Sequence, residues 1–231
     1  TLLASSAASD VYKRQDMYLT PDTMIQASED CGFRTTVIGA VNDFTQSVKE
    51  VENWYEKYHK EDGLTSYELG FHAEYTTKRE ILEGISELSK KYHAPIYTHN
   101  SESASEVAQC VERTGMTPTV YMEQLGLFEY GGGLYHCVHM SEEDLDVVKR
   151  HQISVITNPA SNLKLASGIA PIEEMLKRNI DLAIGTDGPA SNNCLDMFRE
   201  MFLVTALAKY RENDASAVDA AEVLKLSLIH I

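Results

Sequence analysis

Apolar and polar residues follow two different periods along this chain, and each period predicts one kind of secondary structure. In segments such as 77–93 the apolar residues recur every three or four positions, with Ile81, Ile85 and Leu88 on one stripe, which is typical of an amphipathic helix. Shorter segments such as TTVIGAV at 35–41 are β-branched and apolar, which predicts a buried strand. The two kinds of segment alternate along most of the chain.

This alternation predicts the fold class. Helical spacing is found at 22–33, 47–60, 77–93, 103–115, 141–151 and 171–179, and two more helices are predicted after residue 188. The predicted strands are 35–41, 65–73, 94–100, 133–140, 153–160 and 181–188. Strands that alternate with helices predict an α/β fold with a parallel sheet covered by helices. Six or so such units without a Gly-rich dinucleotide loop favour a (β/α) barrel over a doubly wound sheet. The GGG at 131–133 does not match such a loop, and we interpret it as a hinge.

Both ends of the chain depart from the pattern. Residues 1–15 (TLLASSAASDVYKRQ) are mostly small and polar with a basic patch, and they lack the layout of a cleavable signal peptide. Residues 226–231 follow a good helical start but end without a cap. We therefore expect a non-native leader at 1–15, a folded part at 16–225 and a non-native tail at 226–231.

Composition and charge exclude several classes of partner. The 231 residues are 43% hydrophobic and 24% charged, as in ordinary globular proteins, and their net charge is −15. Such a polyanion is a poor ligand for nucleic-acid phosphates or anionic membranes, so neither is an expected partner. No apolar run reaches the roughly 20 residues that span a bilayer. The four cysteines are scattered without a CxxC pair, which favours free thiols and a cytoplasmic location.

Residues with metal-binding chemistry stand at the ends of several predicted strands. His99 ends one strand, His139 the next and Asp187 the last, while Thr157 ends the strand between His139 and Asp187. In a barrel the carboxyl ends of the strands share one face, where active sites are built. Imidazole nitrogen and carboxylate oxygen are ligands of catalytic zinc and iron. The spacing thus predicts His139 as a metal ligand and Glu142, in the next helical turn, as an acid/base residue.

Each of these residues taken alone has a plainer interpretation. Glu142 suits the first turn of a helix behind an N-cap Ser141, and Asp187 suits the turn TDGP. His136 lies three positions before His139, which on a strand turns its side chain to the opposite face, so it fits a structural role better. Cys137 fits a small buried apolar position. The joint occurrence at three strand ends favours a functional site.

Three longer motifs, HCVHMSEED, TNPASNLKLASGIAPIEEML and GTDGPASNNCLDMFREM, resemble the amidohydrolase superfamily. Within it they resemble the 5-methylthioadenosine/S-adenosylhomocysteine deaminase branch and its chlorohydrolase-like relatives, over residues 16 to 225 or so. The resemblance implies a (β/α)8 TIM-type barrel and one divalent metal, usually zinc, with iron as the alternative. It implies that His139 and Asp187 are metal ligands, that Glu142 is the acid/base residue facing a purine, and that His99 contacts the substrate.

The chain also departs from the family pattern. The resemblance implies two more metal ligands from an HxH on the first barrel strand, and no HxH occurs in the sequence. We therefore expect a barrel that is truncated at both ends and holds half of the metal site. Relatives commonly have His-Asn-Pro where this chain has Thr157-Asn158-Pro159, so contacts to the substrate or transition state are expected to differ.

The implied reaction is hydrolytic deamination of an adenosine-type or related heterocyclic substrate, with release of ammonia. Asp187 would accept a proton from metal-bound water and Glu142 would protonate the ring nitrogen. One alternative is another amidohydrolase, such as a guanine deaminase or a triazine chlorohydrolase-like enzyme. A third interpretation is an inactive fragment without two of its metal ligands. The expected partner is a small-molecule substrate, and the resemblance is compatible with a homo-oligomer.

Overall fold

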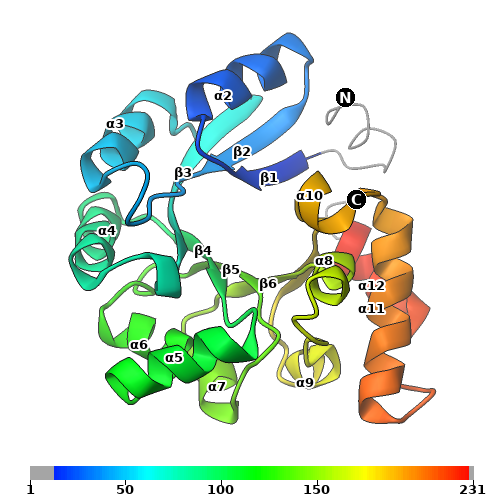
Figure 1. The fold of residues 1–231 in the computed structure, drawn as a ribbon. Helices are drawn as coiled ribbons and strands as arrows, with labels where there is room; N and C mark the ends of the chain where they lie inside the picture. The colour runs from blue at the N-terminus through cyan, green and yellow to red at the C-terminus, as the bar shows by residue number, and fades with distance from the viewer. Residues whose placement is uncertain (1–12, 229–231) are drawn as a thin grey trace. The chain divides into compact units, whose positions relative to one another are not determined.

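The structure is a computed structural model that describes residues 13–228 (Figure 1). Its strands are β1 (Lys13–Met17), β2 (Arg34–Ile38), β3 (Thr65–Ala73), β4 (Ile96–Asn100), β5 (Gly132–His136), β6 (Ser154–Thr157) and β7 (Leu182–Ile184). Its α-helices are α2 (Pro21–Asp30), α3 (Val48–Tyr58), α4 (Arg79–Tyr92), α5 (Ala104–Thr114), α6 (Pro118–Gln124), α7 (Glu142–Arg150), α8 (Pro159–Lys164), α9 (Ile172–Lys177), α10 (Pro189–Asn192), α11 (Met197–Glu212) and α12 (Ala220–Leu228).

The expected leader and tail are only partly covered by the described residues. Residues 1–12 and 229–231 lie outside them. Strand β1, in contrast, begins at Lys13, inside the expected leader, and pairs with β2. Helix α12 likewise runs past residue 226 to Leu228.

The chain divides into two compact units, which are described separately. The first holds residues up to 99 together with 121–133. Its strands β1 to β4 follow one another in sequence order and pair in parallel. The core of this unit is formed by fully buried side chains on β2 and β3, among them Val37, Ile38 and Leu69.

Strand β5 begins in the first unit, at the glycines that the sequence suggested as a hinge. Gly132 has a φ of +145°, and a Cβ at this position would lie 1.8 Å from the carbonyl oxygen of Ile96 on β4. The amide of Ile96 donates to the carbonyl of Gly131 at 3.3 Å. Gly132 therefore allows β5 to approach β4 more closely than a side chain would permit, and the hinge interpretation stays a prediction.

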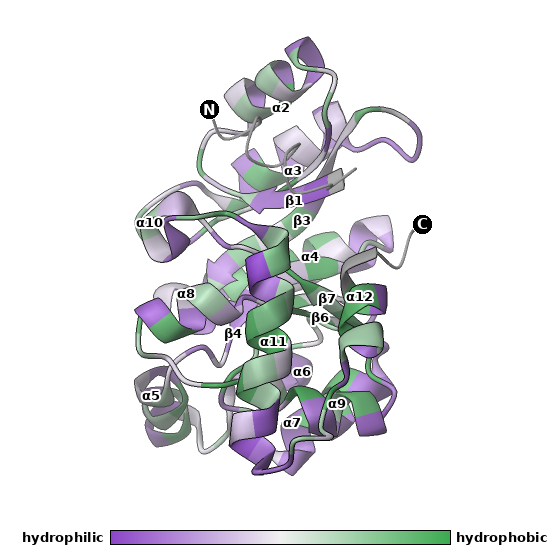
Figure 2. Cartoon of the chain, turned by 90° about the vertical axis from the view of Figure 1, so that its right-hand side faces the viewer, coloured by the Kyte–Doolittle hydropathy of each residue, from purple (hydrophilic) through white to green (hydrophobic). Residues whose placement is uncertain are grey.

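The second unit holds residues 100–120 and those from 134 on. Its strands β6 and β7 pair in parallel, with Val155 opposite Leu182. Helices α5 and α7 both begin with capping boxes, formed by Ser103 with Glu106 and by Ser141 with Asp144. Hydrophobic residues extend along much of α11 and α12 (Figure 2).

The predicted parallel α/β fold is confirmed, because each of the six predicted strands is present and helices separate the strands. The prediction missed β1, whose sequence KRQDM has no apolar run, and the short helices α6, α8 and α10. It also extended β5 too far, to residue 140, whereas the strand ends at His136. Among the helices of residues 13–228, none combines the length and apolar character that a membrane crossing requires.

Candidate active site

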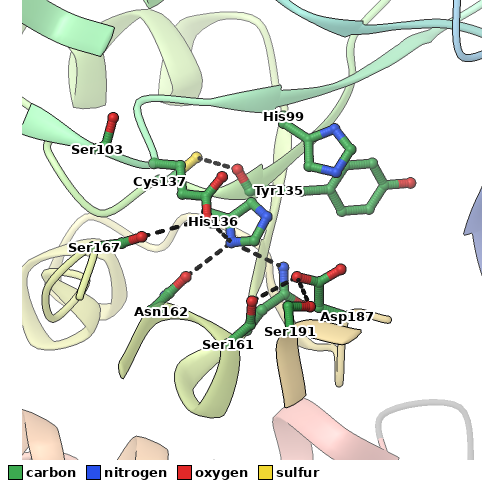
Figure 3. A network of polar contacts seen from close by, with 12 residues as sticks. His99, Ser103, Tyr135, His136, Cys137, Ser161, Asn162, Ser167, Asp187 and Ser191 are labelled. Carbon is green, nitrogen blue, oxygen red and sulfur yellow. Dashed lines mark hydrogen bonds and ion pairs between the residues drawn. The ribbon is translucent and has the colours of Figure 1, made fainter. Parts of the chain in front are cut away.

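Asp187 stands three residues beyond the end of β7, and polar groups surround its carboxylate (Figure 3). The hydroxyls of Ser161 and Ser191 donate to Oδ2 at 2.5 and 2.7 Å, and the amide of Gly188 donates to Oδ1 at 2.6 Å. Burial opposes ionisation of this carboxyl, but the two hydroxyls, the nearby His136 and the Gly188 amide outweigh it and lower the pKa of Asp187. The carboxylate is therefore ionised at neutral pH and available as a ligand or proton acceptor.

His136 is the buried imidazole of this unit. Its Nδ1 lies 2.8 Å from Oδ1 of Asn162 and 3.5 Å from Nδ2 of Asn158. An amide oxygen can only accept, so Nδ1 of His136 carries a proton and donates it to Asn162. The Nδ1 atom is also 3.9 Å from Oε1 of Glu102, which gives His136 an acidic neighbour.

The backbone changes conformation at His136, the last residue of β5. Both His136 and Cys137 have positive φ, at 69° and 49°, so the chain leaves the extended conformation at His136. The next amides bind the segment after β4: Cys137 donates to the carbonyl of Asn100, and Val138 and His139 donate to that of Ser101. The alternation that assigned opposite faces to His136 and His139 does not apply beyond the end of the strand.

Glu102 directly follows Ser101, whose carbonyl accepts the amides of Val138 and His139. Its side chain is 20% exposed, and Oε1 accepts a hydrogen bond of 3.4 Å from Ser167. The backbone around it is held by the buried carboxylate of Glu106, which accepts the amides of Ser101 (3.0 Å), Glu102 (2.9 Å) and Ser103 (3.3 Å). Burial outweighs these bonds and raises the pKa of Glu106. The acid at position 102 is thus presented on an ordered turn.

His99 is the last residue of the first unit and lies on β4. Its Nδ1 is 2.7 Å from the carbonyl oxygen of His72, and the two imidazole rings are 5.0 Å apart. A carbonyl accepts only, so Nδ1 carries the proton and Nε2 the lone pair. An Nδ1–H bond to a backbone carbonyl is also the arrangement that fixes the ring of metal-binding histidines.

The structure places the two other predicted site residues differently. The Glu142 side chain is 79% exposed and forms an ion pair with Arg178, which also binds Asp146 and Glu174. The Nε2 of His139 donates to the carbonyl of Ser167 at 2.7 Å. Within residues 13–228, neither Glu142 nor His139 has a polar contact with Asp187. Their assignment remains a prediction of the family resemblance, and the geometry favours Glu102 and His136.

His139 and Thr157 border two cavities in the second unit. His139 borders an open cleft of about 930 Å³, together with Met140 and Tyr210. Thr157 is buried at the end of β6 and borders a void of about 10 Å³.

A signal for Glu102 is visible in the sequence. His99-Asn-Ser-Glu102 and His139-Met-Ser-Glu142 are two copies of one pattern, His-x-Ser-Glu, and the sequence interpretation considered only the second. A second repeat marks several partners of His136 and Asp187: Pro-Ala-Ser-Asn occurs at 159–162 and at 189–192, at the starts of α8 and α10, and the sequence interpretation did not consider it.

The described residues supply donors suited to a divalent metal. Asp187 is an ionised carboxylate, and His99 has a tautomer fixed by a backbone carbonyl, which are ligand properties of zinc and iron. Among residues 13–228, no three His, Cys, Asp or Glu side chains gather closely enough to hold a metal ion. The donors fit the chemistry of such a site individually.

Comparison with known proteins adds to this geometry. The profile of the family described as "Amidohydrolase family" matches residues 8–228. A 5-methylthioadenosine/S-adenosylhomocysteine deaminase of Caldanaerobacter subterraneus subsp. tengcongensis is 39% identical over 223 residues, which are 93% of this chain and 51% of the relative. A 5'-deoxyadenosine deaminase of Methanopyrus kandleri is 33% identical over 220 residues, with 93% and 51% covered. The chain spans about half the length of these curated relatives.

Solved structures show the same fold. An adenosine deaminase from Xanthomonas campestris with bound zinc superimposes with a TM-score of 0.91 at 31% identity, covering 97% of this chain and 53% of that one. A guanine deaminase from C. acetobutylicum gives a TM-score of 0.87 at 19% identity, covering 98% and 59%, and at this identity it speaks for the fold alone. The predicted TIM-type barrel architecture of metal-dependent amidohydrolases is confirmed.

Proposed function

Because the chain belongs to the amidohydrolase family, we propose that it carries part of the active site of a metal-dependent hydrolytic deaminase. The proposed substrates are adenosine-type compounds, and the proposed product is ammonia. The names of the relatives support this substrate class. The observation that carries the proposal is the ionised Asp187, held by two hydroxyls, in the same unit as a buried His136 and an ordered Glu102.

We propose Asp187 as a ligand of the metal, and His99 as a metal-binding residue on the chemistry of its own unit. The metal is proposed to be zinc, which is bound in the Xanthomonas campestris relative. Such a metal lowers the pKa of bound water from about 15.7 towards roughly 7, so that hydroxide is available at neutral pH.

Two carboxyl groups of the chain are proposed to carry out the proton transfers. Asp187, which its lowered pKa keeps ionised, is proposed as the acceptor for a proton from the attacking water. Glu102 is proposed as the acid that donates to a ring nitrogen of the substrate, since its carboxyl is partly exposed and its backbone is fixed. His136, which donates from Nδ1 to Asn162, is proposed to contact the nucleophile or the substrate through Nε2 and so to orient it.

We also propose a location and an assembly for the whole protein. All four cysteines lie within the described residues as free thiols, which supports the proposed cytoplasmic location. The proposed partner is a small-molecule substrate, and a homo-oligomer remains the proposal drawn from the family.

Ammonia release from the whole protein with bound zinc tests the proposed function. We expect release from methylthioadenosine and adenosine, and loss of that activity when a chelator removes the metal. Guanine and a chlorotriazine are the comparison substrates for the two other amidohydrolase activities. Release from guanine, or chloride from the triazine, at a higher kcat/KM than from both adenosine compounds would contradict the proposed substrate class.

A further inference from the structure

Another buried carboxylate of the second unit, Glu200, is connected to the residues around Asp187. Glu200 belongs to α11 and is fully buried. Its Oε2 accepts the backbone amide of Ala160 at 3.0 Å, and its Oε1 accepts Nδ2 of Asn192 at 2.7 Å. Ala160 is in the first turn of α8 and Asn192 ends α10, so one carboxylate connects three helices.

Each residue that donates a hydrogen bond to Glu200 is the sequence neighbour of a serine that donates to Asp187. Ala160 precedes Ser161, and Asn192 follows Ser191, and these two serines donate to Oδ2 of Asp187. Nδ2 of Asn192 also donates to the carbonyl of Thr186 at 2.7 Å, and Thr186 is the residue before Asp187. We propose that Glu200 is a positioning residue, which sets the orientation of the Asp187 carboxylate through Ser161 and Ser191.

The chemistry of this contact requires a carboxylate. Both partners are N–H donors, and an ionised carboxylate offers an acceptor oxygen to each of them. A glutamine has the same shape but only one acceptor, so one N–H would face its NH₂ group. Burial disfavours the ionised form and raises the pKa of Glu200 despite the bonds from Ala160 and Asn192.

Helix capping does not account for Glu200. The N-cap of α11 is Asp196, whose side chain accepts the amides of Phe198 and Arg199, and Glu200 directs its oxygens to other helices. By contrast, the buried Asp144 forms the capping box of its own helix, α7, and accepts a hydrogen bond from Thr117. Asp144 therefore provides a matched control: a buried carboxylate of the same unit that has no contact with the neighbours of Asp187 among the described residues.

The test compares Glu200→Gln with Asp144→Asn in the whole protein. Zinc affinity is measured by competition with a chelator, since groups that orient a ligand typically change metal affinity 10–100-fold. We expect Glu200→Gln to weaken zinc binding by about this factor and to lower kcat with little change in KM, whereas Asp144→Asn leaves both as in the parent. Equal zinc affinities for parent and Glu200→Gln would overturn the inference.

A further measurement separates positioning from loss of stability. If Glu200 acts through the serines, Glu200→Gln should have little further effect in a Ser161→Ala/Ser191→Ala background, and full additivity would contradict the proposal. Glu200→Asp, which keeps the charge on a shorter arm, provides the variant to use should Glu200→Gln not fold.

The inference rests on the proposed role of Asp187 as a metal ligand, and hydrogen exchange distinguishes the two ideas. Glu200→Gln should speed exchange of the amides at 160–162 and 186–192, with or without zinc, while Asp144→Asn should not. If the parent binds no zinc but Glu200→Gln still exchanges these amides faster than the parent, the metal site is refuted and the positioning is supported. Unchanged exchange would refute the positioning.

Discussion

Two segments of this chain share the pattern His-x-Ser-Glu, yet the structure gives them opposite surroundings. In the first, His99 donates from Nδ1 to a carbonyl, and Glu102 lies on an ordered turn with its carboxylate 3.9 Å from a buried imidazole. In the second, His139 donates from Nε2, and Glu142 points to solvent in an ion pair with Arg178. The four-residue pattern alone therefore does not determine the surroundings of its histidine and glutamate. They depend on where the pattern lies relative to the end of the strand.

The strand end explains the difference. His99 lies inside β4, whereas β5 ends three residues before His139, at two residues in the left-handed conformation. The second pattern consequently falls on a loop and on the first turn of α7, where an acidic side chain is favoured by the helix dipole.

The largest predicted contrast is in metal binding. His99→Ala should remove a ligand and abolish stoichiometric zinc binding by the whole protein, whereas His139→Ala should keep it, because Nε2 of His139 donates to the carbonyl of Ser167. Metal content after dialysis, measured by atomic absorption, distinguishes the two. A zinc-free His139→Ala protein beside a zinc-loaded His99→Ala protein would reverse the assignment.

The second contrast concerns the support of the first segment. Glu106→Gln leaves the buried amide of Ser101 and the half-buried amides of residues 102 and 103 without full partners, which should cost about 1–3 kcal/mol of unfolding free energy. Glu112→Gln, at an exposed position of the same helix, is the matched control and should cost little. Chemical denaturation measures both, and equal stabilities would show that the turn does not depend on Glu106.

The contribution of the Glu106 carboxyl to the free energy of unfolding should also vary with pH. The pKa of Glu106 is raised in the folded state, so the folded protein binds this proton more tightly than the unfolded chain. Its contribution is full below the ordinary glutamate pKa of 4.5 and declines as pH rises through the raised value. The parent should therefore lose stability relative to Glu106→Gln over that window in denaturation curves, and a parallel pH dependence of the two proteins would contradict this.

The smallest predicted effect is at the second segment. Arg178→Gln breaks ion pairs with Glu142, Asp146 and Glu174 that are open to water, and water and salt screen such pairs. The thermal midpoint and the deamination rate should both stay close to those of the parent. A large loss of activity in Arg178→Gln with unchanged stability would assign Glu142 a role in the reaction.

The sequence predicted the fold better than the site. Apolar runs and helical stripes identified six of the seven described strands, while β1 escaped because KRQDM has no apolar alternation. Very short helices such as α8 and α10 escaped because fewer than two turns cannot establish a period.

Some residues of the candidate site could be identified from the sequence and others could not, for a physical reason. His99 and Asp187 were identifiable because they stand at or just after strand ends, which a barrel brings to one face. His136 was assigned a structural role because nothing local predicts two successive residues with positive φ. Its partners Asn158 and Asn162, and the serines at Asp187, come from loops and helices whose packing the local pattern does not encode.

Glu102, and not Glu142, is proposed as the acid of the reaction. The most direct measurement is kcat for ammonia release from methylthioadenosine by zinc-loaded Glu102→Gln and Glu142→Gln forms of the whole protein. Removal of a general acid typically lowers the rate about 10²–10⁴-fold, and we expect this loss for Glu102→Gln, with zinc retained and Glu142→Gln close to the parent. A loss of that size in Glu142→Gln, with Glu102→Gln as active as the parent, would contradict the account.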